Sequence, residues 1–231
     1  RCLMFATSGG TIKKTPLEAY SRPRTNGIRA IVLDEGDEVV AVDFTRPGDT
    51  VLLCGADGQS IRFDEGAART MGRSSRGVRG IRLRSGDGVV GMVVTVPDSE
   101  VLTVCAGGGG KRTPVDGYPV QGRGGQGVIN IRTTERSGPV VGVETVCAGD
   151  DVLFITESGM IVRTSAEDIS SMGRSTQGVR LVNPKAGDRV VNMAVVRAAD
   201  LARFDTEAAE GEAEVAATSD QGAADNSEEE S

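Results

Sequence analysis

Gly122-Arg123-Gly124-Gly125-Gln126-Gly127-Val128 is a short glycine–arginine loop whose pattern recurs along the chain. Close copies occupy residues 72–78 and 173–179, and a looser copy occupies residues 22–28. The glycines that close these loops are Gly27, Gly77, Gly127 and Gly178, so the steps between them are 50, 50 and 51 residues. Self-similarity at a fixed period indicates a repeat architecture. We therefore expect one array of four units.

Each unit shows the same order of elements. An apolar, β-like run opens it, at residues 3–7, 51–55, 101–105 and 152–156. A glycine turn and a return strand follow, at residues 11–15, 60–63, 111–113 and 161–164. Segments such as 17–20 and 166–169 are predicted to be a loop or one short helical turn. Two further strands are expected after each glycine–arginine loop: one at residues 28–33, 78–83, 128–132 and 179–182, and one marked by the valine pairs 39–40, 89–90, 140–141 and 190–191.

Four short strands in each unit of about 50 residues are typical of propeller blades, which must cover one another to bury their faces. The predicted fold is all-β and propeller-like, with four blades of four strands each. The domain covers residues 1–200, with units at about 3–47, 51–97, 101–147 and 152–198. Aromatic residues make up only 3% of the chain and Trp is absent, so Val, Ile, Leu and Met must build the core.

Charge is unevenly distributed along the chain. Residues 1–200 carry 25 basic and 23 acidic side chains, whereas residues 201–231 carry Arg203 against 10 acids; the balances of +2 and -9 give the net charge of -7. The last segment is too polar to bury a core, and we expect a disordered acidic tail. It would act either as a solubilising end or as an acidic mimic of DNA, which would compete with DNA for the basic residues of residues 1–200.

Several classes of function find no support in the composition. The chain has no His, which excludes His-based catalytic groups and leaves no metal cluster, and we predict neither catalytic nor metal-binding residues. The four cysteines, at 2, 54, 105 and 147, are too scattered for a Cys-x-x-Cys pair and are expected to be free thiols in a reducing, cytoplasmic compartment. Tyr20 and Tyr118 share one repeat position, which predicts packing. No apolar run is long enough to cross a membrane and no signal peptide is visible, so no membrane partner is expected.

Basic residues also follow the repeat. The return strands carry Lys14, Arg62, Arg112 and Arg163, with Lys111 beside Arg112. Arg73, Arg123 and Arg174 stand four residues before a closing glycine, and Arg29, Arg79, Arg132 and Arg180 follow the loops. Equivalent positions share one rim of a blade array, so a band of positive charge is expected there. Such a band suits a phosphate backbone, and scarce aromatic residues favour duplex DNA over single strands. Alternatively, the arginines pair with nearby acids and the glycines merely permit positive φ at blade corners.

These residues resemble the C-terminal domain of the A chain of bacterial DNA gyrase. The likeness covers about residues 3–198 and is most evident at 71–73, 80–83 and 110–113. It implies a β-pinwheel, a propeller-like disc whose blades exchange strands and whose basic rim wraps duplex DNA. The family's box, Gln-Arg-Arg-Gly-Gly-Lys-Gly, is matched at five of seven positions by residues 121–127, so the resemblance adds Gln121, Gly124, Gly125 and Gly127 to the predicted DNA-binding residues.

The resemblance also implies a larger assembly. In the holoenzyme the domain supports ATP-driven negative supercoiling together with gyrase B and a second copy of gyrase A. ATP and Mg²⁺ are expected only there, and no cofactor is expected in this stretch. Because the chain begins at Arg1 and shows four units where the family's discs usually have six, we expect a fragment that lacks two N-terminal blades, the principal box and the catalytic region. Two alternatives remain: the equivalent domain of topoisomerase IV, and a propeller used as a platform for protein contacts.

Overall fold

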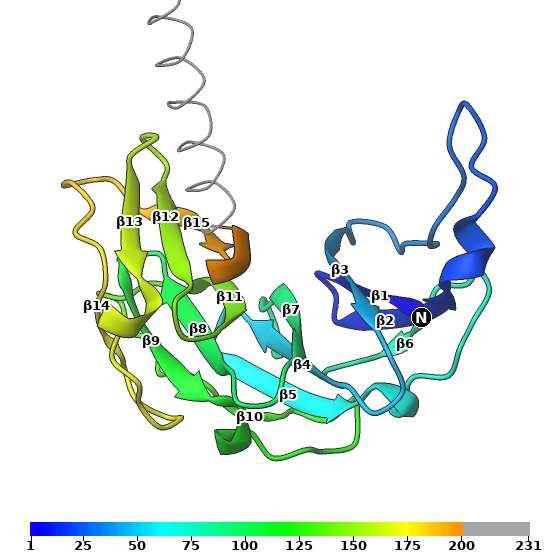
Figure 1. Ribbon diagram of the computed structural model, residues 1–231, viewed down its shortest axis with the longest axis horizontal. Helices are drawn as coiled ribbons and strands as arrows, with labels where there is room; N and C mark the ends of the chain where they lie inside the picture. The colour runs from blue at the N-terminus through cyan, green and yellow to red at the C-terminus, as the bar shows by residue number, and fades with distance from the viewer. Residues whose placement is uncertain (201–231) are drawn as a thin grey trace, which may run out of the picture.

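The computed structural model describes residues 1–200, which form four antiparallel sheets arranged along an arc (Figure 1). We call the segments that build them units 1 to 4, covering residues 2–45, 50–95, 100–146 and 151–196. The predicted all-β fold with four repeats is confirmed. The predicted acidic tail lies outside the described residues.

The order of the elements repeats from unit to unit, except that unit 1 has no short strand after its 3₁₀ helix. Unit 1 contains β1 (Cys2–Thr7), β2 (Thr11–Pro16), η1 (Leu17–Tyr20) and β3 (Val39–Thr45). Unit 2 contains β4 (Thr50–Gly55), β5 (Gln59–Asp64), η2 (Glu65–Ala67), β6 (Val78–Arg79) and β7 (Val89–Thr95). Unit 3 contains β8 (Glu100–Cys105), β9 (Gly109–Pro114), η3 (Val115–Gly117), β10 (Val128–Ile129) and β11 (Val140–Val146). Unit 4 contains β12 (Asp151–Thr156), β13 (Ile161–Ser165), η4 (Ala166–Asp168), β14 (Val179–Arg180) and β15 (Val190–Val196). The short 3₁₀ helices η1 to η4 stand where helical turns were predicted.

The units exchange strands. The sheet orders are β3-β1-β2-β6, β10-β5-β4-β7, β11-β8-β9-β14 and β13-β12-β15. The short strand of each unit therefore pairs with the return strand of the preceding unit, as Val78 does opposite Ile12. This agrees with the exchange of strands between blades that the resemblance to the gyrase family implied. Residues 28–33 form no strand, and the sheet of unit 4 has three strands within residues 1–200.

The hydrophobic core lies between successive sheets. Alternate residues of one strand point to opposite neighbours, so each middle sheet is buried on both faces. On β4, Val51 and Leu53 pack against unit 1, whereas Leu52 and Cys54 pack against unit 3. Aliphatic side chains dominate these clusters, in line with the composition.

The strand β3 and its counterparts form the inner edges of the sheets. β3 contacts β7, β7 contacts β11, and β11 contacts β15. The exchanged strands β6, β10 and β14 occupy the opposite, outer edges. No helix within residues 1–200 has the length and apolar character needed to cross a membrane.

Candidate nucleic-acid interface

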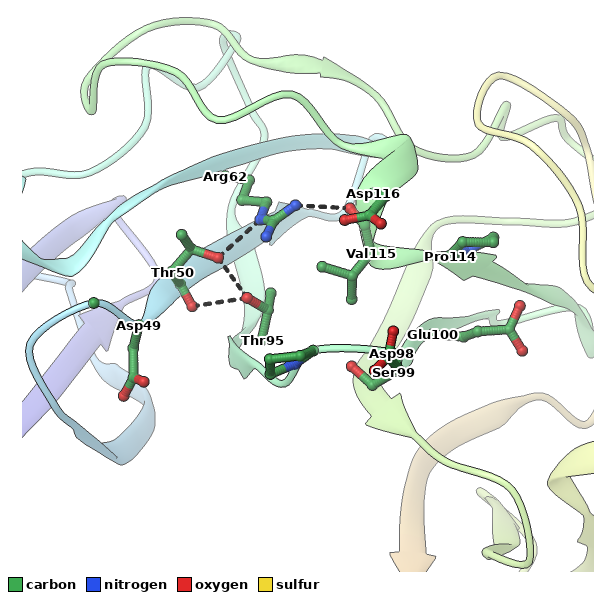
Figure 2. A pocket seen from close by; sticks show the side chains of 12 residues that line it. Asp49, Thr50, Arg62, Thr95, Asp98, Ser99, Glu100, Pro114, Val115 and Asp116 are labelled. Carbon is green, nitrogen blue, oxygen red and sulfur yellow. Dashed lines mark hydrogen bonds between the residues drawn. The ribbon is translucent and has the colours of Figure 1, made fainter.

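In units 1 to 3, the basic residue of the return strand bonds to the unit that follows. Figure 2 shows Arg62 at the junction of units 2 and 3, where its Nε donates to Thr50 Oγ1 (2.8 Å) and its Nη1 donates to the carbonyl of Val115 (2.9 Å). The same Nη1 also donates to the carbonyl of Tyr118 at 3.2 Å. Arg112 repeats the arrangement one unit later, where its Nε donates to the carbonyl of Ile169 at 2.7 Å. These arginines satisfy carbonyls around η3 and η4, and so they join neighbouring units.

Two of the basic residues on the return strands, Lys14 and Arg112, also form ion pairs with carboxylates. Lys14 Nζ lies 2.6 Å from Glu65 Oε2, and both side chains are only 9% exposed. Arg112 Nη1 lies 2.7 Å from Glu100 Oε2 in a mostly buried pair. Removing one partner of such a pair leaves the other charge desolvated and unpaired, which is costly. The charges of Lys14 and Arg112 are thus already used inside the protein.

Lys111 has no exposed surface at all. Its Nζ donates to the carbonyl of Gly173 at 2.7 Å and to Thr113 Oγ1 at 3.0 Å. Lys14, taken as a whole residue, is only 7% exposed. The prediction that Lys14 and Lys111 contact DNA therefore needs correction: buried ammonium groups cannot reach a phosphate at the surface.

The loop arginines reach back to the preceding unit. Arg123 Nε donates to the carbonyl of Ala67 at 2.9 Å, and its Nη1 donates to the carbonyl of Arg79 at 3.1 Å. Arg174 makes the equivalent bonds one unit later, to the carbonyls of Gly117 and Ile129. Arg73 retains one of the two, to the carbonyl of Arg29 at 3.2 Å. The glycine–arginine loops of units 2 to 4 are thus each fixed to the preceding unit by their arginine.

The rest of the loop at residues 121–127 also packs on unit 2. The backbone N–H of Gln121 donates to the carbonyl of Arg62 at 2.8 Å. The side-chain oxygen Oε1 of Gln121 is buried and has no hydrogen-bond partner within residues 1–200. Gly127 has φ 73°, and a Cβ there would overlap the carbonyl oxygen of Ser60. Gly125, in contrast, is exposed, and a Cβ there would meet no atom closer than 3.7 Å. Only part of this loop therefore faces solvent.

A second set of arginines has no internal role within the described part of the chain. Arg29, Arg79, Arg82 and Arg132 are exposed, and their guanidinium groups have neither a hydrogen bond nor an ion pair within residues 1–200. Arg79 belongs to β6, an outer-edge strand. The amides of Arg82 and Arg132 donate to the carbonyls of Gly125 and Thr176 in the next glycine–arginine loops, at 2.8 and 2.9 Å. This set, which we call the rim arginines, leaves free positive charge beside the loops.

Arg163 is the exception among the strand residues. It occupies the position of Arg62 and Arg112 but is 61% exposed, and its guanidinium pairs with Asp151 of its own unit. No unit follows within residues 1–200 to supply carbonyls. Without a following unit to bind, the arginine at this repeat position therefore stays exposed and pairs within its own unit.

The cavity in Figure 2 is not suited to a phosphate. It has a volume of about 560 Å³ and lies at the junction of units 2 and 3. Around Arg62 it is lined by Asp49, Asp98, Glu100 and Asp116. These carboxylates would repel an anion. No group of His, Cys, Asp or Glu residues in the described part of the chain is arranged to hold a metal ion.

Buried titratable groups give the fold a pH dependence. Burial, with a smaller contribution from the Arg174 charge, lowers the pKa of Lys111 from 10.5 to about 8. Above pH 8 the unfolded chain thus binds a proton that the folded protein lacks, and the free energy of unfolding rises with pH. Burial also raises the pKa of Cys54 from 9.0 to about 12 and that of Cys105 to about 11. Above pH 9 these thiols ionise only on unfolding, so the free energy falls again.

We therefore expect stability to rise above about pH 8 and to be maximal near about pH 9, as measured by urea unfolding on both sides of that value. The Lys111→Met variant should show a smaller rise on the acid side. Burial also lowers the pKa of Lys13, so part of the rise should persist. An unchanged slope in the variant would mean that Lys111 does not lose its proton in the folded state.

Comparison with known families adds to this geometry. The sequence matches the family described as "DNA gyrase C-terminal domain, beta-propeller" at residues 3–46, 49–95, 99–147 and 150–197, one match for each unit. The chain belongs to this family.

Curated relatives within the family are several times longer than the chain. The DNA gyrase A protein of Salmonella typhimurium is 43% identical over 218 residues, which cover 93% of this chain and 25% of the relative. The DNA gyrase A protein of Streptococcus pyogenes serotype M3 is 50% identical over 200 residues, covering 87% and 24%. The chain therefore spans about a quarter of the length of these relatives.

Two solved structures share the fold. The C-terminal domain of DNA topoisomerase IV matches with a TM-score of 0.83 and 25% identity, over 91% of this chain and 66% of that one. The DNA gyrase A C-terminal domain matches with a TM-score of 0.77 and 22% identity, over 84% and 65%. The β-pinwheel architecture is thus common to both kinds of enzyme.

Proposed function

We propose that the domain binds double-stranded DNA along its outer edge and bends it, as the DNA-wrapping module of a gyrase A protein. The observation that carries the proposal is the set of rim arginines. Their guanidinium groups are exposed and have no partner within residues 1–200. Exposed guanidinium groups bind phosphate oxygens without regard to base sequence.

The arrangement of the rim favours a bent duplex. Arg82 and Arg132 stand at equivalent places on successive units of a curved array (Figure 1). A duplex that contacts both must follow the curvature, and the cost of bending is offset by the added phosphate contacts. The scarcity of aromatic side chains, 3% of the chain, disfavours stacking on single-stranded bases.

The other predicted DNA-binding residues take different parts in this proposal. Arg73, Arg123 and Arg174 hold the loops in place while adding charge close to the DNA. Gly124 and Gly125 allow the phosphate backbone of DNA to approach, with Gln121 and Gly127 fixing the loop beneath. Arg62 and Arg112 serve the junctions, and Arg163 lies at the end of the array.

The gyrase assignment concerns the whole enzyme. Both curated relatives described above are gyrase A proteins, and residues 121–127 carry a partial box, which together favour gyrase over topoisomerase IV. In such an enzyme the domain would support ATP-dependent negative supercoiling with gyrase B and a second copy of gyrase A. ATP and Mg²⁺ would be bound outside this stretch. The compartment would be the bacterial cytoplasm, at the nucleoid.

Salt dependence tests the proposal against a protein-contact platform. We expect the affinity for a short duplex, measured by fluorescence anisotropy, to fall linearly with salt on logarithmic axes, with a slope of about -0.9 for each phosphate contact. A single strand of equal length should bind more weakly. Negligible binding at low salt, or binding that salt does not change, would contradict DNA binding and favour the platform.

A further inference from the structure

A small pocket opens at the junction of units 3 and 4. It has a volume of about 230 Å³ and lies between the hairpin turn of β8 and β9, the turn before β11 and the loop that leads into β14. Its polar lining comes from Thr134, Arg136, Ser137, Gln177 and Arg180, beside three glycines and Val179. No acidic residue among residues 1–200 lines it.

The other two junctions are hollowed at the same place, beside the closing glycines of the loops of units 2 and 3, but there carboxylates line the hollow. At the junction of units 1 and 2, Asp34 and Asp37 line it, and Asp34 Oδ1 lies 2.6 Å from Arg76 Nη1. At the junction of units 2 and 3, Asp87 lines it, and Arg84 is already paired with a carboxylate. These acids compensate the nearby arginines and would repel an anion.

A longer turn in unit 3, at residues 134–138, explains the missing carboxylate. In units 1 and 2 the N–H before the turn glycine donates to a side chain, Oδ1 of Asp37 (2.7 Å) and Oδ1 of Asp87 (3.0 Å). In unit 3 the N–H of Gly107 donates instead to the backbone carbonyl of Ser137 at 2.7 Å. The hairpin turn is thus satisfied without an acid, and the pocket keeps its positive charge.

Both arginines of the pocket have their charge available. Arg136 and Arg180 are exposed, and neither pairs with a carboxylate within residues 1–200. Arg180 Nη1 donates only to the neutral side-chain oxygen of Asn183, at 2.7 Å. Glu135 of the same turn is exposed and does not line the pocket. Guanidinium groups bind phosphate oxygens with several N–H donors at once, and the amide of Gln177 adds two more.

The size and lining of the pocket limit what it can hold. A volume of about 230 Å³ is smaller than the roughly 300–1,000 Å³ of pockets that bury a whole small molecule. No aromatic side chain among residues 1–200 lines it, so a nucleobase finds no surface to stack on. We propose that the pocket binds a single phosphate group, supplied either by a DNA backbone or by free phosphate. With DNA as the source, the inference rests on the proposed function and fixes the duplex at this junction.

Two variants alter the pocket in different ways. Ser137→Asp supplies the kind of carboxylate that units 1 and 2 carry, and it can still accept the hydrogen bond that Ser137 Oγ accepts within the turn at 2.8 Å. Arg136→Gln with Arg180→Gln removes both guanidinium groups. The control, Arg22→Gln with Arg24→Gln, makes an equal charge change at exposed residues of unit 1, at the other end of the arc (Figure 1). Far-UV circular dichroism checks that all variants fold.

Inorganic phosphate is the first probe, titrated into isotope-labelled protein at constant ionic strength so that screening does not change. We expect the backbone N–H resonances of Gly107 and Gly178 to shift saturably. The dissociation constant should rise at least about tenfold in both pocket variants and stay unchanged in the control. No saturable shift with phosphate or with DNA would overturn the proposal, as would equal affinities in the wild type and both pocket variants.

A short DNA duplex is the second probe and distinguishes the two sources. If DNA supplies the phosphate, the duplex should shift the same resonances, and inorganic phosphate should compete with it. Phosphate that binds in the pocket while the duplex binds only elsewhere supports free phosphate as the ligand. A duplex that binds without moving these resonances, together with no phosphate binding, would overturn the inference and leave the proposed function standing. Phosphate binding without any duplex binding would do the reverse.

Discussion

Reversing two rim charges, with Arg82→Glu and Arg132→Glu together, is expected to weaken duplex binding about a hundredfold at low salt. Both side chains are exposed without a partner within residues 1–200, whereas their amides are fixed to the next loop. Losing these charges should therefore weaken DNA binding without destabilising the fold. The salt slope should become shallower by about two, because two phosphate contacts are lost.

Arg84→Glu with Arg189→Glu provides a control of equal charge change. These arginines are also exposed, but they pair with Asp57 at 3.1 Å and with Glu157 at 3.0 Å. We expect a much smaller loss of affinity from this pair. Equal losses in the two variants would show that net charge, rather than the rim, governs binding. No loss in either would remove the rim as the interface.

The second large effect concerns stability. Gly127→Ala should lower the free energy of unfolding by more than about 3 kcal/mol, because it combines an unfavourable φ with an overlap against a backbone carbonyl. Gly127 has φ 73°, and the added Cβ would collide with the Ser60 carbonyl of the preceding unit. The variant should thus disrupt the pairing of β10 with β5 of the preceding unit.

Gly27 is a matched control inside the same chain. It closes the first loop with φ 77°, but nothing lies within 4 Å of the added Cβ. Gly27→Ala should therefore cost only about 1 kcal/mol, from the backbone conformation alone. Urea unfolding followed by far-UV circular dichroism measures both, which suits a chain without Trp. Equal costs would mean that close approach between units contributes little.

Much of the fold could be predicted because the repeat reinforces weak local signals. A single apolar run such as residues 51–55 is ambiguous, but four of them in register with glycine turns indicate hairpins. The exchange of strands was not visible in the residues of one unit. Val78 pairs with Ile12 of the preceding unit, and nothing in the local pattern of residues 78–83 states which sheet it joins. Residues 28–33 have a similar pattern but form no strand, and no sheet within residues 1–200 pairs with them.

The candidate site was harder to predict because one residue type serves two purposes. Lys111 and Arg112 are adjacent on a strand, so alternation places their side chains on opposite faces, and this signal could have indicated that one is buried. Arg123 and Arg174 bind carbonyls one unit back, which periodicity alone does not reveal. Arg82 and Arg132 occupy one repeat position, which carries arginine in only these two units, so the repeat did not single out Arg82.

Bending of DNA tests the central claim most directly. A short duplex labelled at its two ends with a donor and an acceptor reports its end-to-end distance by energy transfer. If the duplex follows the outer edge of the arc, transfer should rise when the domain binds, and it should not rise with the Arg82→Glu, Arg132→Glu variant at equal occupancy. A duplex that binds tightly and stays straight would contradict the account.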